Sequence, residues 1–256
     1  MAASNLLEEW KNFKLTSEED KIAVDIDSSA LEGTGKCLEL SLICKLLSKR
    51  SISCTVLKNT LKIAWKLDCK AFSVDIIGFN IFLFNFNRSS DRNRILRMGP
   101  WTFDRALIII DNPVSLTKPL DMDFRNVSLW VHFFDLSLAC MNKTMATRLG
   151  NAIGLFEDVE SNANNFCWGS CLRVRVRFDV MKPLHRGIKL NLDGPMGGCW
   201  IPIQYERLPD FRYHCGRLDH ILKDCSDCCV DSVSKNLQYG PWLRFQGHKN
   251  SSNILS

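Results

Sequence analysis

Cysteine and histidine residues near the carboxyl end of the sequence recur at the spacing of metal ligands. Cys215, His220 and Cys225 form the pattern C-x4-H-x4-C. Thiolates and imidazoles are the usual ligands of tetrahedral zinc, and a zinc knuckle of the C-x2-C-x4-H-x4-C type supplies four of them. The first of these four positions is occupied by Arg212. We therefore expect either a three-ligand zinc site with an open position or a decayed motif that holds no metal.

The open position has several candidate ligands, because further donors lie close in the sequence. The candidates for the fourth ligand, besides water, are His214, Cys228 and Cys229. Three protein ligands bind zinc more weakly than four. Arg212 would itself add affinity for phosphate, since a guanidinium group pairs well with phosphate oxygens. Both interpretations of this segment, metal site and relic, stay open.

Arginines recur at every second position of the segment 172–178, whose sequence is LRVRVRF. In a β-strand this alternation places the arginines on one face, about 6.6 to 7 Å apart, and the apolar residues on the other. That spacing resembles successive phosphates of a single nucleic-acid strand. The residues that we expect to contact nucleic acid are Arg173, Arg175, Arg177, Lys182 and Arg186, joined by Arg212, Tyr213 and Arg217 near the knuckle. The alternative is a charged face that only prevents edge pairing.

Motifs of the common enzyme classes do not accompany these features. The sequence has no G-x-S-x-G, no phosphate-binding glycine loop and no H-E-x-x-H. Asp121 and Asp123 form a D-x-D pair that, with Asp135, suggests at most a metal-dependent nuclease. Nothing else in the chain supports two-metal chemistry, so we expect a protein that is not an enzyme and has no small-molecule substrate.

Composition and charge limit the class of protein and the kind of partner that this chain can have. The 256 residues are 46% hydrophobic, enough for a sizeable core, and the net charge of +5 favours a polyanionic partner. The longest apolar stretch, 72–86, is interrupted by polar residues, so we expect no membrane span. The acidic first 21 residues do not resemble a secretory signal. We expect an intracellular protein, nuclear or cytoplasmic, whose scattered cysteines stay reduced.

Pattern periodicity predicts an α+β fold that positions these residues. Residues 1–35 form a flexible lead-in with one short helix around Leu6–Phe13. Residues 36–112 follow the order β-α-β-β-α-β, an RRM-like split βαβ unit. Its expected strands are 37–47, 71–77, 81–87 and 106–110, and its helices begin near 54 and 89. Three phenylalanines share one face of the third strand, and we expect them in the core rather than stacked on bases: Phe82, Phe84 and Phe86.

A second small α+β unit, residues 113–208, carries the arginine row. Its expected elements are a strand at 128–134, a helix at 143–153, and strands at 155–160, 171–180, 187–192 and 200–206. The degenerate zinc knuckle follows at 209–229, and residues 230–256 form a flexible tail. The basic strand and the knuckle therefore belong to the same half of the chain.

Several short stretches resemble one plant family over roughly residues 36–245, that of the domain of unknown function 4283 followed by a zinc knuckle. The stretches are LKNTL at 57–61 with Trp65, GPWTFD at 99–104, LWVH at 129–132, Ile153-Gly154, YERLPDF at 205–211 and YGPWLR at 239–244. The resemblance implies a Gag-like product of a LINE-type retrotransposon that binds element RNA with help from the knuckle. Arg212 and Asp219 depart from the family pattern, which has cysteine and glycine there.

Together these features predict a single-stranded RNA-binding or DNA-binding protein with little sequence preference. The alternative from another class is an assembly module, in which the split βαβ unit pairs with itself or with another protein. Salt-dependent retention of RNA would favour the first function, and salt-independent self-association would favour the second.

Overall fold

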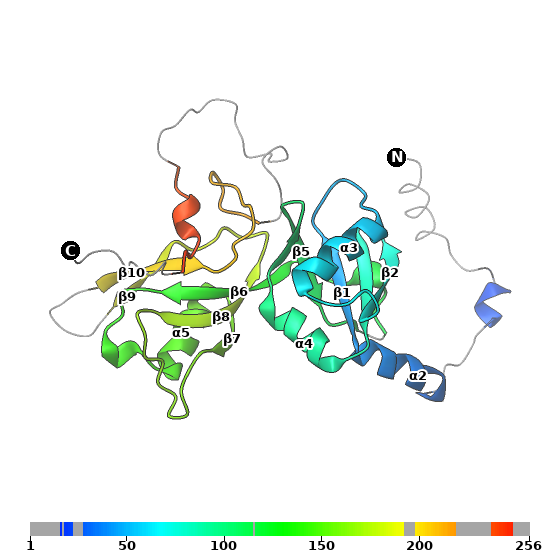
Figure 1. Ribbon diagram of the computed structural model, residues 1–256, viewed down its shortest axis with the longest axis horizontal. Helices are drawn as coiled ribbons and strands as arrows, with labels where there is room; N and C mark the ends of the chain where they lie inside the picture. The colour runs from blue at the N-terminus through cyan, green and yellow to red at the C-terminus, as the bar shows by residue number, and fades with distance from the viewer. Residues whose placement is uncertain are drawn as a thin grey trace. The chain divides into compact units, whose positions relative to one another are not determined.

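The computed structural model describes residues 16, 18–22, 28–114, 116–191, 198–218 and 237–247 (Figure 1). The chain divides into two compact units, Met1–Cys37 and Leu38–Ser256. The first unit contains a short 3-10 helix, η1 (Glu19–Lys21), and most of helix α2 (Ser28–Glu39). The helix expected at Leu6–Phe13 lies outside the described residues. Within the described part of the chain, no helix is both long and apolar enough to cross a bilayer.

The first sheet is antiparallel, with the strand order β2-β3-β1-β5-β4. Its elements along the chain are β1 (Ser41–Leu46), α3 (Cys54–Trp65), β2 (Phe72–Gly78), β3 (Ile81–Phe86), α4 (Ser89–Met98), β4 (Trp101–Phe103) and β5 (Ala106–Asp111). Without β4, the order β2-β3-β1-β5 and the two intervening helices are those of a split βαβ unit. The predicted α+β class is confirmed.

One core joins both helices to the same face of this sheet. Leu57, Leu61 and Trp65 lie on one side of α3, as helical spacing requires, and all three are buried with Ile95 of α4. The three alternating phenylalanines of β3 are buried in the same cluster, which confirms that they are core residues: Phe82, Phe84 and Phe86.

Two features of this sheet differ from the sequence prediction. The predicted first strand begins at Cys37, but α2 continues through Glu39 and β1 starts only at Ser41. Strand β4 was not predicted, because its hairpin to β5 lacks the usual glycine signal. Asp104 and Arg105 adopt positive φ angles of 46° and 66° there, which is the geometry of a type I′ turn.

The second sheet is also antiparallel, in the order β7-β8-β6-β10-β9. Its elements are β6 (Asn126–Phe133), α5 (Lys143–Ile153), β7 (Leu155–Val159), β8 (Leu172–Asp179), β9 (Gly187–Asn191) and β10 (Gly198–Tyr205), with short 3-10 helices η2 (Pro119–Asp121), η3 (Leu138–Cys140) and η4 (Pro241–Leu243). The predicted strands and the helix of this part end within two residues of these bounds. Helix α5 is capped by Asn142, whose side chain accepts a hydrogen bond from the backbone N–H of Met145.

Gly154 ends α5 where the chain turns directly into β7. A Cβ atom here would lie 2.5 Å from the backbone oxygen of Arg177 and 2.7 Å from Val176 Cγ1, both in β8. Because β8 lies inside the sheet and cannot move aside, we expect Gly154→Ala to lower the free energy of unfolding by about 1–3 kcal/mol in urea denaturation. Gly33→Ala, where a Cβ would meet nothing within 4 Å, is the matched control. Equal stability of the two variants would contradict this packing.

Candidate nucleic-acid interface

The arginine row of β8 has the alternation that its sequence predicts. Leu172, Val174 and Val176 are fully buried in the core that α5 covers. The arginines lie on the opposite face of the sheet, which β6 and β10 continue. The position of each arginine is therefore confirmed, but its partners could not be foreseen from the strand alone.

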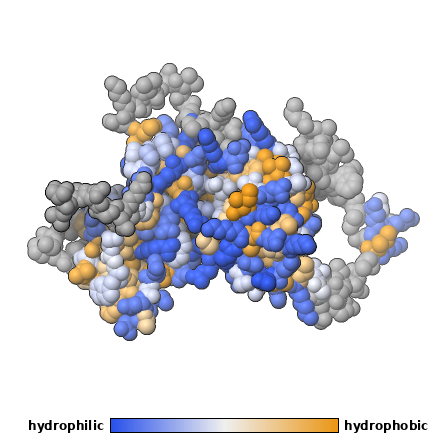
Figure 2. Space-filling model, viewed as in Figure 1, coloured by the Kyte–Doolittle hydropathy of each residue, from blue (hydrophilic) through white to orange (hydrophobic). Residues whose placement is uncertain are grey.

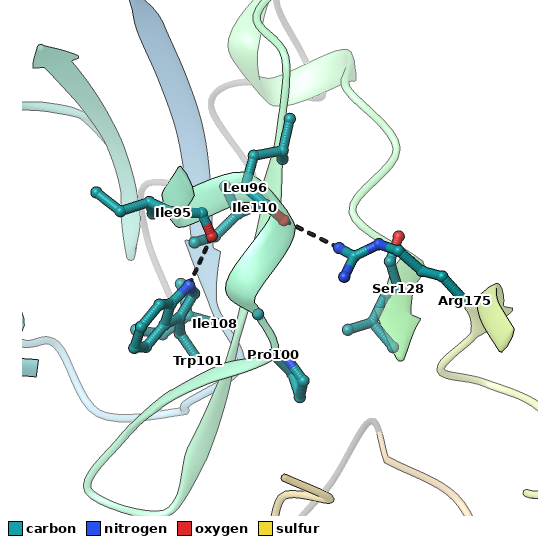
Figure 3. A pocket seen from close by; sticks show the side chains of 10 residues that line it. Ile95, Leu96, Pro100, Trp101, Ile108, Ile110, Ser128 and Arg175 are labelled. Atoms are coloured by element: carbon teal, nitrogen blue, oxygen red, sulfur yellow. Dashed lines mark hydrogen bonds between the residues drawn. The ribbon is translucent and has the colours of Figure 1, made fainter. Parts of the chain in front are cut away.

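Arg175 is buried, with 7% of its surface exposed, at the end of helix α4. Its guanidinium donates hydrogen bonds to the backbone oxygens of Leu96, at 3.0 Å, and Arg97, and it pairs with Glu157 at 3.2 Å. In Figure 3 its side chain extends from the second sheet toward the Leu96 carbonyl. Burial disfavours the charge and lowers the pKa of Arg175, while Glu157 acts in the opposite direction. The guanidinium of Arg175 therefore binds groups of the same chain, where a contact with nucleic acid was expected.

Arg173 and Arg177 also have acidic partners. Arg173 holds Glu206 through two hydrogen bonds, Nε to Oε1 at 2.6 Å and Nη2 to Oε2 at 3.0 Å, and its guanidinium lies 3.8 Å from the centre of the Trp130 ring. Arg177 forms an ion pair with Asp111. The expectation of an open row of three arginines is therefore corrected, because carboxylates distant in sequence neutralise the row.

The last carbonyl groups of α4 receive donors from outside the helix. The indole N–H of Trp101 donates to the Ile95 oxygen at 2.9 Å (Figure 3), and Arg207 donates to the Met98 oxygen at 2.7 Å. With the two bonds from Arg175, every carbonyl of 95–98 is satisfied. The final carbonyls of a helix lack partners within it and carry partial negative charge, so cationic donors stabilise them. Arg175 and Arg207 therefore connect the second half of the chain to helix α4, which packs on the first sheet.

Exposed basic and aromatic side chains gather instead on the hairpin of β9 and β10. Lys189 and Trp200 are directly opposite one another, so both side chains are on the same face. The indole of Trp200 is 57% exposed, and Lys189 is exposed beside it. Arg186, which precedes β9, is also exposed and lies over the ring of Tyr239 at 5.8 Å. We use the name hairpin surface for Trp200 and Lys189, which share one face of the hairpin, together with Arg186, which lies just before β9.

Two glycines allow the long side chains of the hairpin surface to lie flat. A Cβ at Gly187 would come within 2.4 Å of the Trp200 indole, and a Cβ at Gly198 would come within 2.7 Å of Lys189 Cε. The indole therefore covers Gly187 and the lysine stem covers Gly198. One ring face of Trp200 rests on the strand, which leaves the other accessible. Figure 2 shows that hydrophilic residues cover most of the visible face of the described chain.

The part of the predicted knuckle that the structure describes ends at Leu218. Residues 211–218 form a tight turn, in which the backbone N–H of Gly216 donates to the Arg212 oxygen at 2.8 Å. Gly216 has a φ of 72°, and its α-carbon lies against the ring of Tyr239. Arg212 is buried, which differs from the expectation of a phosphate contact at this position.

Some of the predicted knuckle residues lie within the part of the chain that the structure describes, and others lie outside it. Tyr213 and Arg217 are half-buried, Cys215 is half-buried, and His214 is exposed. The predicted ligands His220, Cys225 and Cys228 lie outside the described residues, as does Cys229. Over the positions that the structure covers, no three His, Cys, Asp or Glu side chains come together as a metal site.

The two aspartates of the D-x-D pair line one cavity and differ in their partners. Asp121 ends η2, and the carboxylate of Asp123 is held by Arg125 at 2.8 Å. Hydrogen bonds from Arg125 lower the pKa of Asp123. Both carboxylates line a cavity of about 580 Å³, together with Arg177. Arg125 therefore pairs with Asp123, while Arg177 pairs with Asp111 in the same lining.

Sequence reasoning overlooked the hairpin surface, although part of its signal was present. Lys189 and Arg186 belong to the basic segment, but Trp200 was assigned only to a strand. An isolated tryptophan is usually a core residue. The signal that it is exposed is the pair of glycines, Gly187 and Gly198, at the positions where large side chains must lie flat across a hairpin.

The fold and this surface define a mixed α+β chain in which a split βαβ unit precedes a second sheet with an aromatic and basic hairpin. A family model described as "Domain of unknown function (DUF4283)" matches residues 36–117, so this part of the chain contains that domain. A comparison with curated proteins gave no match.

Proposed function

We propose that this chain is a non-catalytic protein that binds single-stranded nucleic acid, RNA in particular, through the hairpin surface. This proposal rests on Trp200, whose exposed indole lies across the backbone of Gly187 and beside Lys189. Stacking of a base on an aromatic ring contributes about 1–3 kcal/mol and tolerates any base. Arg186 and Lys189 supply the positive charge that the phosphates need.

The expected ligand is RNA because of the resemblance to Gag-like retrotransposon proteins. The DUF4283 match supports the first part of that resemblance. We propose that residues 209–229 complete it as a degenerate zinc knuckle, on the basis of the spacing of Cys215, His220 and Cys225. An intracellular location, nuclear or cytoplasmic, accompanies this function.

Removal of the exposed indole should weaken RNA binding directly. We expect Trp200→Ala to raise the dissociation constant for a fluorescent single-stranded RNA about 5-fold to 100-fold, as the loss of one stacking contact implies. Fluorescence anisotropy at a fixed salt concentration gives the affinity. Trp168→Ala is the matched control, because Trp168 is 58% exposed but stacks on Phe166. Equal losses in both variants, or none in Trp200→Ala, would refute the assignment.

The salt dependence of binding should report the two cations of the hairpin surface. Each phosphate that is neutralised contributes about 0.7 to the slope of log affinity against log salt for a single strand. We expect the double variant Arg186→Ala/Lys189→Ala to reduce that slope by about 1.4. Arg148→Ala, an exposed arginine of α5, should leave the slope unchanged. An unchanged slope in the double variant would place the phosphates elsewhere.

Restoration of the first knuckle position should strengthen zinc binding. Arg212→Cys completes the pattern C-x2-C-x4-H-x4-C. Four thiolate and imidazole ligands close a tetrahedral site, so we expect zinc affinity to rise by at least about tenfold in competition with a chromophoric chelator. Arg212→Ser removes the buried arginine without adding a ligand and serves as the control. If both variants bind zinc equally, this segment is a relic and not a knuckle.

A second candidate function, assembly, is favoured by exposed apolar side chains in the first sheet unit. Ile63 of α3 and Ile76 of β2 are mostly exposed, and Phe79 follows in the hairpin turn. Light scattering after size exclusion would show concentration-dependent, salt-independent self-association if these residues form an interface. A monomer that retains RNA at low salt would exclude this function in favour of nucleic-acid binding.

A further inference from the structure

Three polar side chains far apart in the sequence meet on the central strands of the second sheet. His132 of β6 is opposite Arg173 of β8 on one side and Gln204 of β10 on the other. Cys171 is two residues before Arg173, and Glu206 is two residues after Gln204. Because side chains two residues apart share a face, this register places Cys171 and Glu206 diagonally on either side of the imidazole.

The distances form a continuous chain of hydrogen bonds. His132 Nδ1 lies 3.0 Å from the sulfur of Cys171, and Nε2 lies 2.6 Å from Glu206 Oε1. The imidazole is buried and stacks on Phe245, with 3.7 Å between the ring centres and 8° between the planes. Glu206 is fixed in turn by the fork of Arg173. His132 is therefore held at both ring nitrogens, and Glu206 is held by both His132 and Arg173.

The charges in this cluster determine where the protons lie. Burial would raise the pKa of Glu206, but hydrogen bonds from His132 and Arg173 outweigh it and lower that pKa to about 2. The ionised carboxylate accepts the hydrogen of Nε2, so Nδ1 is the nitrogen that faces the thiol as a proton acceptor. Burial disfavours the imidazolium, yet the bonds to Cys171 and Glu206 raise the pKa of His132.

We propose that Cys171 is a modification site, a nucleophilic thiol that His132 deprotonates and that reacts with peroxides. A thiolate beside an imidazolium, with a carboxylate on the far nitrogen, is the arrangement that activates cysteine nucleophiles. Cys171 is only half-buried, at the start of β8, whereas the imidazole behind it is buried. Cys171 is therefore partly accessible, at one end of the buried imidazole.

The oxidation needs only the side chains of this cluster and a peroxide. The Sγ–H proton moves to Nδ1 of His132, and the thiolate attacks one oxygen of the peroxide. An S–O bond forms while the O–O bond breaks, so the sulfur is oxidised to a sulfenic acid and the peroxide is reduced. The leaving oxygen takes the proton from the imidazolium and departs as water or an alcohol. Glu206 stays ionised throughout and stabilises the transient imidazolium.

The test is the reactivity of Cys171 relative to another cysteine in the same chain. The full-length protein is treated with iodoacetamide at pH 6, where ordinary thiols are protonated, and alkylation is followed by peptide mass spectrometry. We expect Cys171 to react at least about tenfold faster than Cys199, which is exposed. Cys171 should also be the site that dimedone traps after hydrogen peroxide. Equal or slower reaction of Cys171 would overturn the proposal without any variant.

Two variants separate activation by the cluster from simple exposure. His132→Gln and Glu206→Gln should each lower the alkylation rate of Cys171 to that of Cys199 or below, while the rate of Cys199 stays constant. Thermal unfolding monitored by circular dichroism verifies that each variant is folded at the assay temperature. A folded His132→Gln variant in which Cys171 reacts as fast as in the parent would refute the role of the imidazole. RNA binding through Trp200 is measured separately, so the two proposals fail independently.

Discussion

Replacement of Arg175 by methionine is expected to lower the free energy of unfolding by about 3–5 kcal/mol, the cost of removing one member of a buried charged pair. The change leaves Glu157 without its buried partner and two carbonyls of α4 without donors. Methionine retains most of the apolar volume, so the loss reports the polar contacts. Urea denaturation followed by tryptophan fluorescence gives the free energy.

Two comparisons make the Arg175 result specific. Arg175→Lys keeps the charge, but an ammonium cannot bind two carbonyls and a carboxylate as a planar fork does, so most of the loss should remain. Arg148→Met changes an exposed arginine of α5 and should shift stability by less than about 0.5 kcal/mol. If Arg175→Met is as mild as Arg148→Met, the arginine is dispensable for joining the sheets.

The second large effect is an acid-dependent loss of stability that depends on Glu206. The pKa of Glu206 falls from 4.5 to about 2 in the folded chain, despite the burial that opposes this shift, because His132 and Arg173 hold its carboxylate. A lowered carboxyl pKa contributes stability above pH 4.5 that disappears as the pH falls toward 2. The shift of about 2.5 units corresponds to about 3 kcal/mol at neutral pH.

Glu206→Gln should isolate this contribution as a difference between two pH profiles. At pH 7 we expect the variant to be about 3 kcal/mol less stable than the parent, and the gap should close as the pH falls from 4.5 toward 2. Glu160→Gln is the matched control, because Glu160 also pairs with Arg173 but is 71% exposed. Its effect should stay below about 1 kcal/mol at any pH. A constant gap for Glu206→Gln would show that its carboxylate is not responsible.

Local patterns predict most elements of this fold because each has its own periodic signal. The predicted helix at 143–153 agrees with the bounds of α5, whose start is capped by Asn142 and whose end is followed by Gly154. The alternating residues of β8 predicted which face each arginine takes. The short β4 escaped prediction, because three residues carry no periodicity and Arg105 stands at the turn position where glycine is usual.

The candidate site was less predictable, because its properties depend on partners far along the chain. Arg175 meets Leu96 across 79 residues, and His132 meets Glu206 across 74. No local pattern shows that one arginine of a row is buried at a helix end while Lys189, of the same charge, stays exposed. Sequence spacing therefore identified a basic segment, and tertiary contacts decided which of its members are open to a ligand.

The capping of α4 has a consequence for the order in which the chain folds. Arg175 and Arg207 are 78 to 109 residues from the carbonyls that they bind. During synthesis, helix α4 leaves the ribosome long before either arginine, so the carbonyl groups of residues 96–98 can bind only water until β8 and the segment after β10 arrive. The segment 36–117 that the family model matches contains the helix without these donors. Amide hydrogens at the end of α4 should therefore exchange quickly in a fragment that ends at residue 117 and slowly in the whole chain.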